Sequence, residues 1–226
     1  VIACEVTGTG ANGITSNAVA PLIFGNYIHD LTGIGLSMTQ LSGTVALMNN
    51  IIDTATLQGI AFSGAWGAAV ASFLLVHGNT VYGCGDSGLE VTDADANLVL
   101  INNIFSENGN AAGEYNVEWV AGAAEYVSFH GWNVFYHSGG GGGANLSGLT
   151  VNAQVASSEF TTDPSFTDAA GGNFALGSTS PAKATGFPGQ FLGGSLGYLD
   201  IGAVQRQEAG GGGILVHPGM SGGMRG

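Results

Sequence analysis

The sequence predicts an all-β solenoid of about five to six stacked coils, each with three short strands. Five asparagines recur in the same local setting, at spacings of 24, 29, 24 and 30 residues: Asn26, Asn50, Asn79, Asn103 and Asn133. An apolar run precedes each asparagine, and most are followed by a phrase of Gly, an aliphatic residue, any residue and an apolar residue. Periods of about 20–50 residues are typical of solenoids, because one coil cannot bury its apolar side alone.

The apolar run before each asparagine is the first expected strand of its coil. These runs cover residues 21–24, 45–48, 73–76, 98–101 and 126–129. They are too short for helices and favour β-strands. The asparagine that follows suits a tight corner, and its side-chain amide can hydrogen-bond the asparagines above and below. We therefore expect a ladder of asparagines along one corner of the solenoid.

The phrase that begins with glycine predicts another strand of each coil, and its outward side chains form a column. That column is expected to read Gly35, Ala61, Glu90, Glu118 and Thr150. Glu90 and Glu118 would then lie about 5 Å apart on neighbouring rungs, near the carboxylate separation of a retaining glycosidase. With Asp93 and Asp95 close by, the same acids are also a candidate Ca²⁺ site. The third interpretation is a solvated acidic ridge.

A second column of polar side chains follows the asparagines by three residues. Its members are His29, Asp53, Tyr82, Ser106 and Tyr136. Imidazole, carboxylate and phenol groups in one line predict a glycan-binding strip or a proton relay. Polar side chains at a corner are otherwise simply solvated. Trp132, next to the ladder, offers either a face for sugar stacking or packing surface.

The three-part repeat with its asparagine corners resembles the right-handed parallel β-helix of the pectate-lyase-like superfamily, over roughly residues 1–160. The resemblance implies a right-handed coil, but it implies no activity, since that superfamily contains lyases, hydrolases, tailspikes and inert spacers. Its lyases typically use Lys or Arg beside the uronate, and no Lys or Arg precedes Lys183. His130-Gly131 only partly matches the Gly-His-Gly phrase of the polygalacturonases.

We divide the chain into a β-helix (1–159, first coil incomplete), a capping segment (160–208) and a glycine-rich tail (209–226). The phrases at 163–166, 173–176, 180–182 and 200–203 resemble the closing segment, called choice-of-anchor type Q, of bacterial β-helix proteins. Its apolar side chains are expected to plug the open end of the core: Phe166, Phe174, Leu176, Phe187, Phe191 and Leu192. Tail residues Ile214, Leu215 and Val216 are expected to fold back on the solenoid, to dock on another subunit, or to form a disordered end.

The charge balance narrows the range of partners. The chain has 3 Lys and Arg against 16 acids, a net charge of −13, which disfavours nucleic acid because phosphate contacts need a basic face. An anionic polysaccharide would also be repelled unless metal ions intervene. No apolar run approaches the roughly 20 residues of a membrane span. Cys4 and Cys84 are expected at the same corner position three coils apart, roughly 14 Å, too far for a disulfide.

These observations favour a non-enzymatic structural or adhesive β-helix outside the cell, either on a virion, as a phage capsid-decoration or fibre protein, or on a cell surface or filament. The reasons are the 8% charged residues, the unfinished first coil, the apolar tail and the lack of a basic catalytic group. The expected partners are other protein subunits and, in an adhesive role, a surface glycan; no cofactor is expected apart from Ca²⁺. The alternatives are a glycoside hydrolase that uses Glu90 and Glu118, and a Ca²⁺-dependent glycan-binding module.

Overall fold

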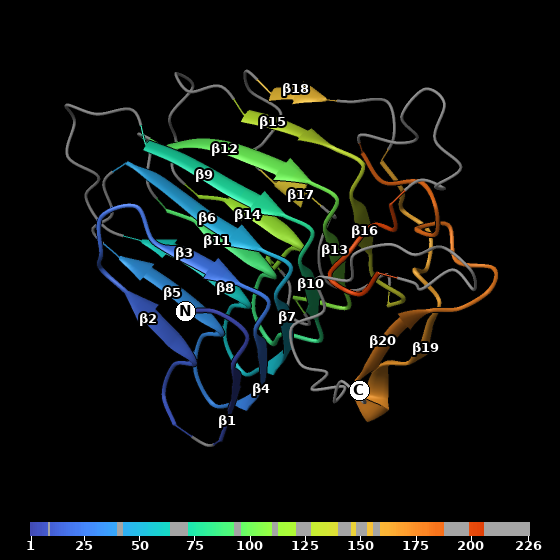
Figure 1. Cartoon of the computed structure of the whole chain (residues 1–226), viewed down its shortest axis with the longest axis horizontal. Coiled ribbons are helices and arrows are strands. Elements are labelled where there is room, and N and C mark those ends of the chain that lie inside the picture. Colours follow the sequence, from blue (N-terminus) through green and yellow to red (C-terminus); the bar gives the residue numbers. More distant parts are fainter. Residues whose placement is uncertain are drawn as a thin grey trace, which may run out of the picture.

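The chain forms a parallel β-helix, as expected. The computed structural model describes residues 1–8, 10–39, 43–63, 72–92, 96–109, 113–120, 128–139, 146–147, 153–155, 159–187 and 199–205. Three parallel six-stranded sheets surround one core, and each coil gives one strand to each sheet (Figure 1). No helix in the described ranges has the length and apolar character needed to cross a membrane.

The three sheets correspond to the three expected parts of the repeat. Sheet 1 follows the asparagine corner, with the order β1 (Glu5–Thr7), β4 (Tyr27–Leu31), β7 (Ile51–Ala55), β10 (Thr80–Tyr82), β13 (Ile104–Ser106) and β16 (Val134–Tyr136). Sheet 2 contains β2 (Ile14–Ser16), β5 (Leu36–Thr39), β8 (Ile60–Ser63), β11 (Leu89–Val91), β14 (Val117–Trp119) and β17 (Leu146–Ser147). Sheet 3 precedes the corner and contains β3 (Leu22–Phe24), β6 (Thr44–Met48), β9 (Ser72–His77), β12 (Ala96–Ile101), β15 (Ser128–Gly131) and β18 (Ala153–Val155).

Asparagine side chains form a continuous ladder at the corner between sheets 3 and 1. From Asn26 to Asn133, each side-chain amide nitrogen donates to the amide oxygen of the next asparagine at 2.8–3.1 Å. The same oxygens also accept the backbone N–H of the asparagine one rung before, at 2.9–3.0 Å. The residue before each asparagine has a positive φ. Three of these residues are not glycine: Asn49, Asn102 and Trp132. The left-handed conformation lets the chain turn sharply at the corner.

The ladder has different ends. At its last rung Asn133 donates to the Glu159 carboxylate at 3.3 Å, and Phe160 forms a parallel bridge with Val134. The repeat therefore keeps its register through Glu159 and Phe160. At the first rung Cys4 occupies the ladder position, because Glu5 pairs with Tyr27, and its backbone N–H donates to Asn26 at 3.0 Å.

Both cysteines are free, as expected, but the expectation that they share one corner position of the coil is wrong. Cys84 lies five residues after its ladder asparagine and is completely buried in the core. Cys4 lies in the ladder position itself and is exposed. The two residues therefore do not share one position within the coil, although three rungs still separate them.

The described part of the C-terminal segment packs on the outside of sheet 1, so the expectation that Phe166, Phe174, Leu176 and Phe187 plug the open end of the core is wrong. The outward side chains of Ile104 and Val134 form a second apolar cluster with Ala182 and Ile201, and Phe166 and Leu176 pack against it. Further contacts of Phe174 with Tyr82 and of Phe187 with Trp132 lie outside the core. The hairpin β19 (Phe166–Asp168) and β20 (Asn173–Leu176) belongs to this layer (Figure 1). Phe191 and Leu192 lie outside the described residues.

Candidate functional site

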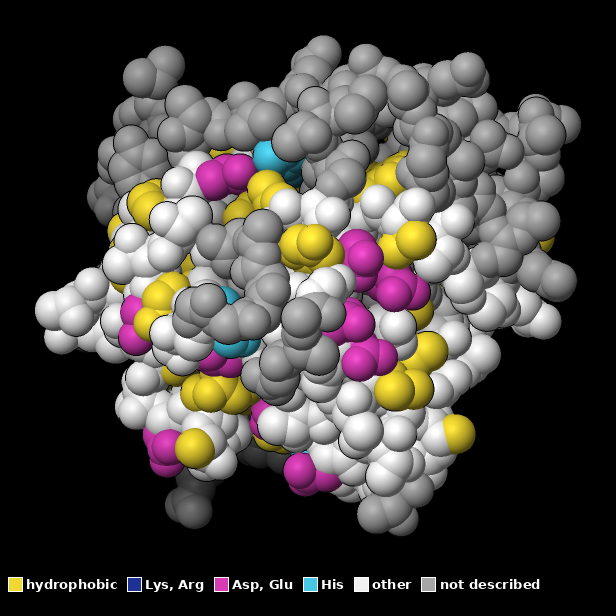
Figure 2. All heavy atoms as spheres, turned by 180° about the vertical axis from the view of Figure 1, so that it is seen from behind, with side chains coloured by type: hydrophobic (Ala, Val, Ile, Leu, Met, Phe, Trp, Pro, Cys, Tyr) yellow, Lys and Arg dark blue, Asp and Glu magenta, His cyan; other side chains and the backbone are white. Residues whose placement is uncertain are grey.

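The expected pair of glutamates lies on the outer face of sheet 2. Glu90 of β11 and Glu118 of β14 are register partners on neighbouring strands. Glu90 accepts a hydrogen bond from Gln58 at 3.2 Å, and Ser87 donates to Glu118 at 2.7 Å. Burial raises the pKa of Glu90, and the negative charge of Glu118 raises it further. Asp and Glu side chains gather on this face, and no Lys or Arg of the described residues is in view (Figure 2).

The acidic face shows no metal centre within the described ranges. No group of three or more His, Cys, Asp or Glu side chains is arranged there to hold an ion. Asp93 and Asp95, two of the four expected Ca²⁺ ligands, lie outside the described residues. The Ca²⁺ site stays a prediction.

The rest of the expected outward column of sheet 2 was placed in the wrong register at both ends. Ser37, not Gly35, pairs with Ala61, and Ser147 pairs with Glu118. Thr150 lies outside the described residues. The observed column is therefore Thr15, Ser37, Ala61, Glu90, Glu118 and Ser147.

The second expected column is present on sheet 1, where His29, Asp53, Tyr82, Ser106 and Tyr136 pair in register. Its first two members bond within the protein. His29 Nδ1 lies 2.9 Å from Asp30 Oδ2, and its Nε2 lies 3.1 Å from Glu5 Oε1. Burial alone would lower the pKa of His29, but these two carboxylates outweigh it and raise the pKa.

Asp53 is likewise held by its surroundings. Tyr27 donates to Asp53 Oδ2 at 3.3 Å, and burial raises the pKa of Asp53. The pKa of Tyr27 is raised to about 12, first by burial and then by the charge of Asp53. Neither His29 nor Asp53 lines the pocket described next.

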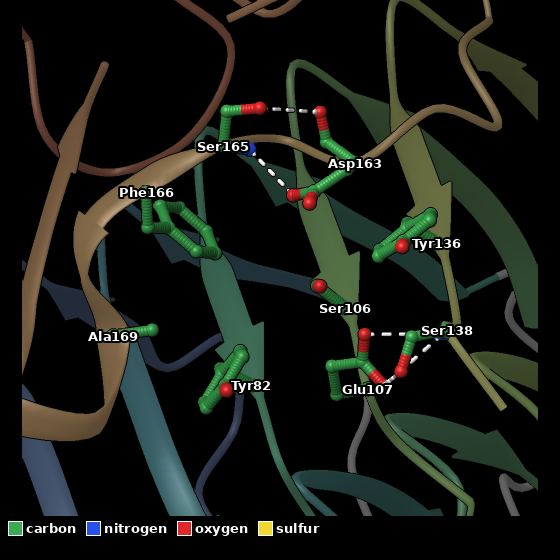
Figure 3. A pocket seen from close by; sticks show the side chains of 9 residues that line it. All are labelled: Tyr82, Ser106, Glu107, Tyr136, Ser138, Asp163, Ser165, Phe166 and Ala169. Atoms are coloured by element: carbon green, nitrogen blue, oxygen red, sulfur yellow. Dashed lines mark hydrogen bonds between the residues drawn. The ribbon is translucent and has the colours of Figure 1, made fainter.

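The other members of this column line a pocket between sheet 1 and the C-terminal segment (Figure 3). Its volume is about 220 Å³. The solenoid contributes Tyr82, Ser106, Glu107, Tyr136 and Ser138, and the C-terminal segment contributes Asp163, Ser165, Phe166 and Ala169. The sequence predicted the column of Tyr82, Ser106 and Tyr136, but no local pattern indicated that residues 163–166 pack against it. The only sequence signal was the run of apolar and turn residues in that phrase.

Carboxylates on the pocket rim are held in place by neighbouring serines. Ser138 donates its backbone N–H to Glu107 at 3.1 and 3.2 Å and its hydroxyl at 2.9 Å. Ser165 donates its backbone N–H to Asp163 Oδ1 at 2.7 Å. The arrangement fixes both carboxylates at the pocket without neutralising them.

A third surface is the outward face of sheet 3, which we call the apolar flank. Its outward side chains are Leu22, Phe24, Ala46, Met48, Phe73, Leu75, Val99, Ile101 and Phe129, interrupted by Thr44, His77 and Asn97. The alternate residues of the same strands fill the core. Leu22 is 47% exposed and Phe73 is 49% exposed. The apolar tail residues Ile214, Leu215 and Val216 lie outside the described residues.

Comparison with known proteins supports the fold and goes no further. The model of the right-handed beta helix region matches residues 1–160. The chain therefore belongs to the right-handed β-helix family. Searches of curated proteins and of solved structures found no match.

Proposed function

We propose that the chain is a non-catalytic structural β-helix of an extracellular assembly, and that two copies associate through the apolar flank. The observation that carries this proposal is the unequal outer faces of the solenoid. Parallel strands that are apolar on both faces are normally covered on both faces. Sheet 3 has such strands, whereas the outward column of sheet 2 is polar and acidic.

A second copy fits the apolar flank better than the tail of the same chain. The flank crosses five rungs, from β3 to β15, which is about 19 Å at the usual strand spacing. The three apolar tail residues span only about 10 Å as a strand. An apolar face of this kind on a soluble protein marks an interaction site. Two flat flanks related by a two-fold axis would cover each other.

Sedimentation equilibrium of the full chain tests this proposal, with paired glutamine variants. Ala46 and Thr15 are both outward residues in the middle of a strand, the first on the apolar flank and the second exposed on sheet 2. Ala46→Gln is expected to weaken association at least about tenfold, because it buries an unpaired amide in the interface. Thr15→Gln should leave association unchanged. A wild-type chain that stays monomeric at all concentrations contradicts the proposal.

The location outside the cell is part of the same proposal and has its own test. A low share of charged residues, 8%, and a rigid stack of coils support a component displayed on a virion or a cell surface. Fractionation of the source should find the chain in particles or at the surface. Its recovery from the cytoplasm alone would contradict this placement.

The register pairing of Glu90 with Glu118 favours one second candidate, a glycoside hydrolase. The raised pKa of Glu90 suits an acid and the adjacent Glu118 suits a nucleophile. A polysaccharide panel scored for new reducing ends separates the two classes. Activity that Glu90→Gln and Glu118→Gln both abolish would replace the structural proposal.

A further inference from the structure

The floor of the pocket between sheet 1 and the C-terminal segment carries a serine hydroxyl that could hydrogen-bond a ligand. Ser106 of β13 is only 1% exposed, yet it lines the pocket. Within the described part of the chain its hydroxyl is not one of the buried side-chain atoms that lack a partner. The hydroxyl therefore opens into the pocket, where it can donate and accept hydrogen bonds.

Two aromatic side chains stand on either side of this floor. Tyr82 and Tyr136 are the register partners of Ser106 on the rungs before and after it (Figure 3). Two rungs are about 9.6 Å apart, which leaves room for one saturated ring between the two phenol rings. Neither phenol hydroxyl has a hydrogen-bond partner among the described residues. The pocket therefore combines aromatic faces with three hydroxyl groups available for bonding.

The rim of the pocket determines the charge of a suitable ligand. Glu107 and Asp163 offer carboxylate oxygens that can accept more hydrogen bonds than their serine partners supply. No Lys or Arg is among the lining residues. An anionic ligand would be repelled, and a ligand with many hydroxyl donors would be favoured. The volume of about 220 Å³ is below the roughly 300–1,000 Å³ of pockets for drug-sized ligands.

We propose that this pocket binds one uncharged pyranose unit of a glycan. The C–H face of the sugar ring packs between Tyr82 and Tyr136. Sugar hydroxyls bond Ser106 on the floor, the phenol hydroxyl of Tyr136 and the Glu107 and Asp163 carboxylates on the rim. The proposal extends the structural role to adhesion and does not depend on association through the apolar flank.

Titration of the ¹⁵N-labelled full chain tests this site by NMR, with backbone amide shifts as the readout. The probes are methyl α-D-glucopyranoside, methyl β-D-galactopyranoside and N-acetyl-D-glucosamine, with D-glucuronate and tetramethylammonium as charged comparisons. At least one neutral pyranose is expected to give saturable shifts at the amides of Ser106 and Ser138. Glucuronate is expected to bind at least about tenfold more weakly, because the pocket is acidic.

Matched variants locate the binding. Ser106→Val removes the floor hydroxyl and fills space, and it should weaken binding at least about tenfold. Ser37→Val is its control, because Ser37 is an equally buried outward serine on β5, 5% exposed and outside the pocket. Tyr136→Phe keeps the ring and should weaken binding about two- to tenfold, whereas Tyr115→Phe should have no effect.

Several results would overturn the proposal. One is the absence of saturable shifts with every pyranose, and another is binding of tetramethylammonium or glucuronate in preference to the neutral sugars. Equal effects of Ser106→Val and Ser37→Val would place the sugar elsewhere. If Ser106→Val does not fold, Tyr136→Phe decides: unchanged binding in that variant contradicts the site.

Discussion

Removal of one ladder asparagine should destabilise the solenoid far more than removal of its neighbour. Asn103 is completely buried. Its side chain donates to Asn133 at 3.0 Å and to the Val76 carbonyl at 2.8 Å. Its oxygen accepts both the backbone N–H and the side-chain amide of Asn79, at 2.9 and 3.1 Å. Its amide also donates to the Ile101 carbonyl at 3.1 Å, so Asn103→Ala removes five contacts at once.

The magnitude follows from the groups left without partners. The Asn79 side chain keeps its bonds to Leu47 and His77, and Asn133 still accepts the backbone N–H of residue 103. The Asn79 backbone N–H loses the ladder partner described above, whereas the Val76 carbonyl lies inside β9 and stays in the sheet that β9 forms with β12. One buried N–H without a partner costs about 1–3 kcal/mol. The variant should therefore lose about 1–3 kcal/mol, a substantial share of the roughly 5–15 kcal/mol that stabilises a typical domain.

Urea unfolding followed by circular dichroism measures this loss, with Asn49→Gly as the matched control. Asn49 has φ 53° and stands just outside the ladder, and Gly78 holds the same position one rung later. Glycine adopts this conformation freely, so the control should change stability by only a few tenths of a kcal/mol. Equal stabilities of Asn103→Ala and Asn49→Gly would refute the role given to the ladder.

Three further predictions concern the surface, the thiols and the C-terminal segment. The pKa of Glu90 is raised in the folded state, so its ionisation destabilises the fold as pH rises above the unfolded pKa of about 4.3. Glu90→Gln should therefore raise Tm more at pH 7 than at pH 3.5. An equal gain at both pH values would contradict this. Cys4 is exposed and should react rapidly with a thiol reagent. Cys84 should react only on unfolding, because it is completely buried and its pKa is raised to about 12. Equal reaction rates of the two thiols in the folded chain would count against the burial of Cys84. Asn102 bonds the backbone of Phe187 through both side-chain atoms, at 2.6 and 2.7 Å, so Asn102→Gly should speed hydrogen exchange of the Phe187 amide at least about tenfold, and unchanged exchange would argue against this anchor.

The fold could be predicted from sequence because the asparagine corner recurs in a nearly fixed local context. A ladder residue has the same neighbours in every coil, so its position is read without ambiguity. The glycine phrase is less reliable, because strand side chains alternate with a period of two and a slip of two residues keeps every side chain on its face. This is why Gly35 was placed where Ser37 lies, two residues further on.

The pocket and the apolar cluster outside sheet 1 could not be predicted in the same way. Each combines solenoid strands with the C-terminal segment, as in the approach of Asp163 and Phe166 to Ser106, about 60 residues earlier in the chain. No repeat links those segments, so spacing carries no information about their contact. The one available signal was the outward position of Ile104 and Val134, apolar side chains that need a cover.

The register of neighbouring rungs underlies every surface described above, and an engineered cysteine pair tests it most directly. Outward partners on adjacent strands lie about 4.8 Å apart, within the Cα separation of about 4.4–6.8 Å that a disulfide accepts. In a Cys4→Ser background, Glu90→Cys with Glu118→Cys should form a disulfide on mild oxidation. Ala61→Cys with Glu118→Cys, two rungs apart, should remain reduced. A disulfide in the second pair but not in the first would contradict the register.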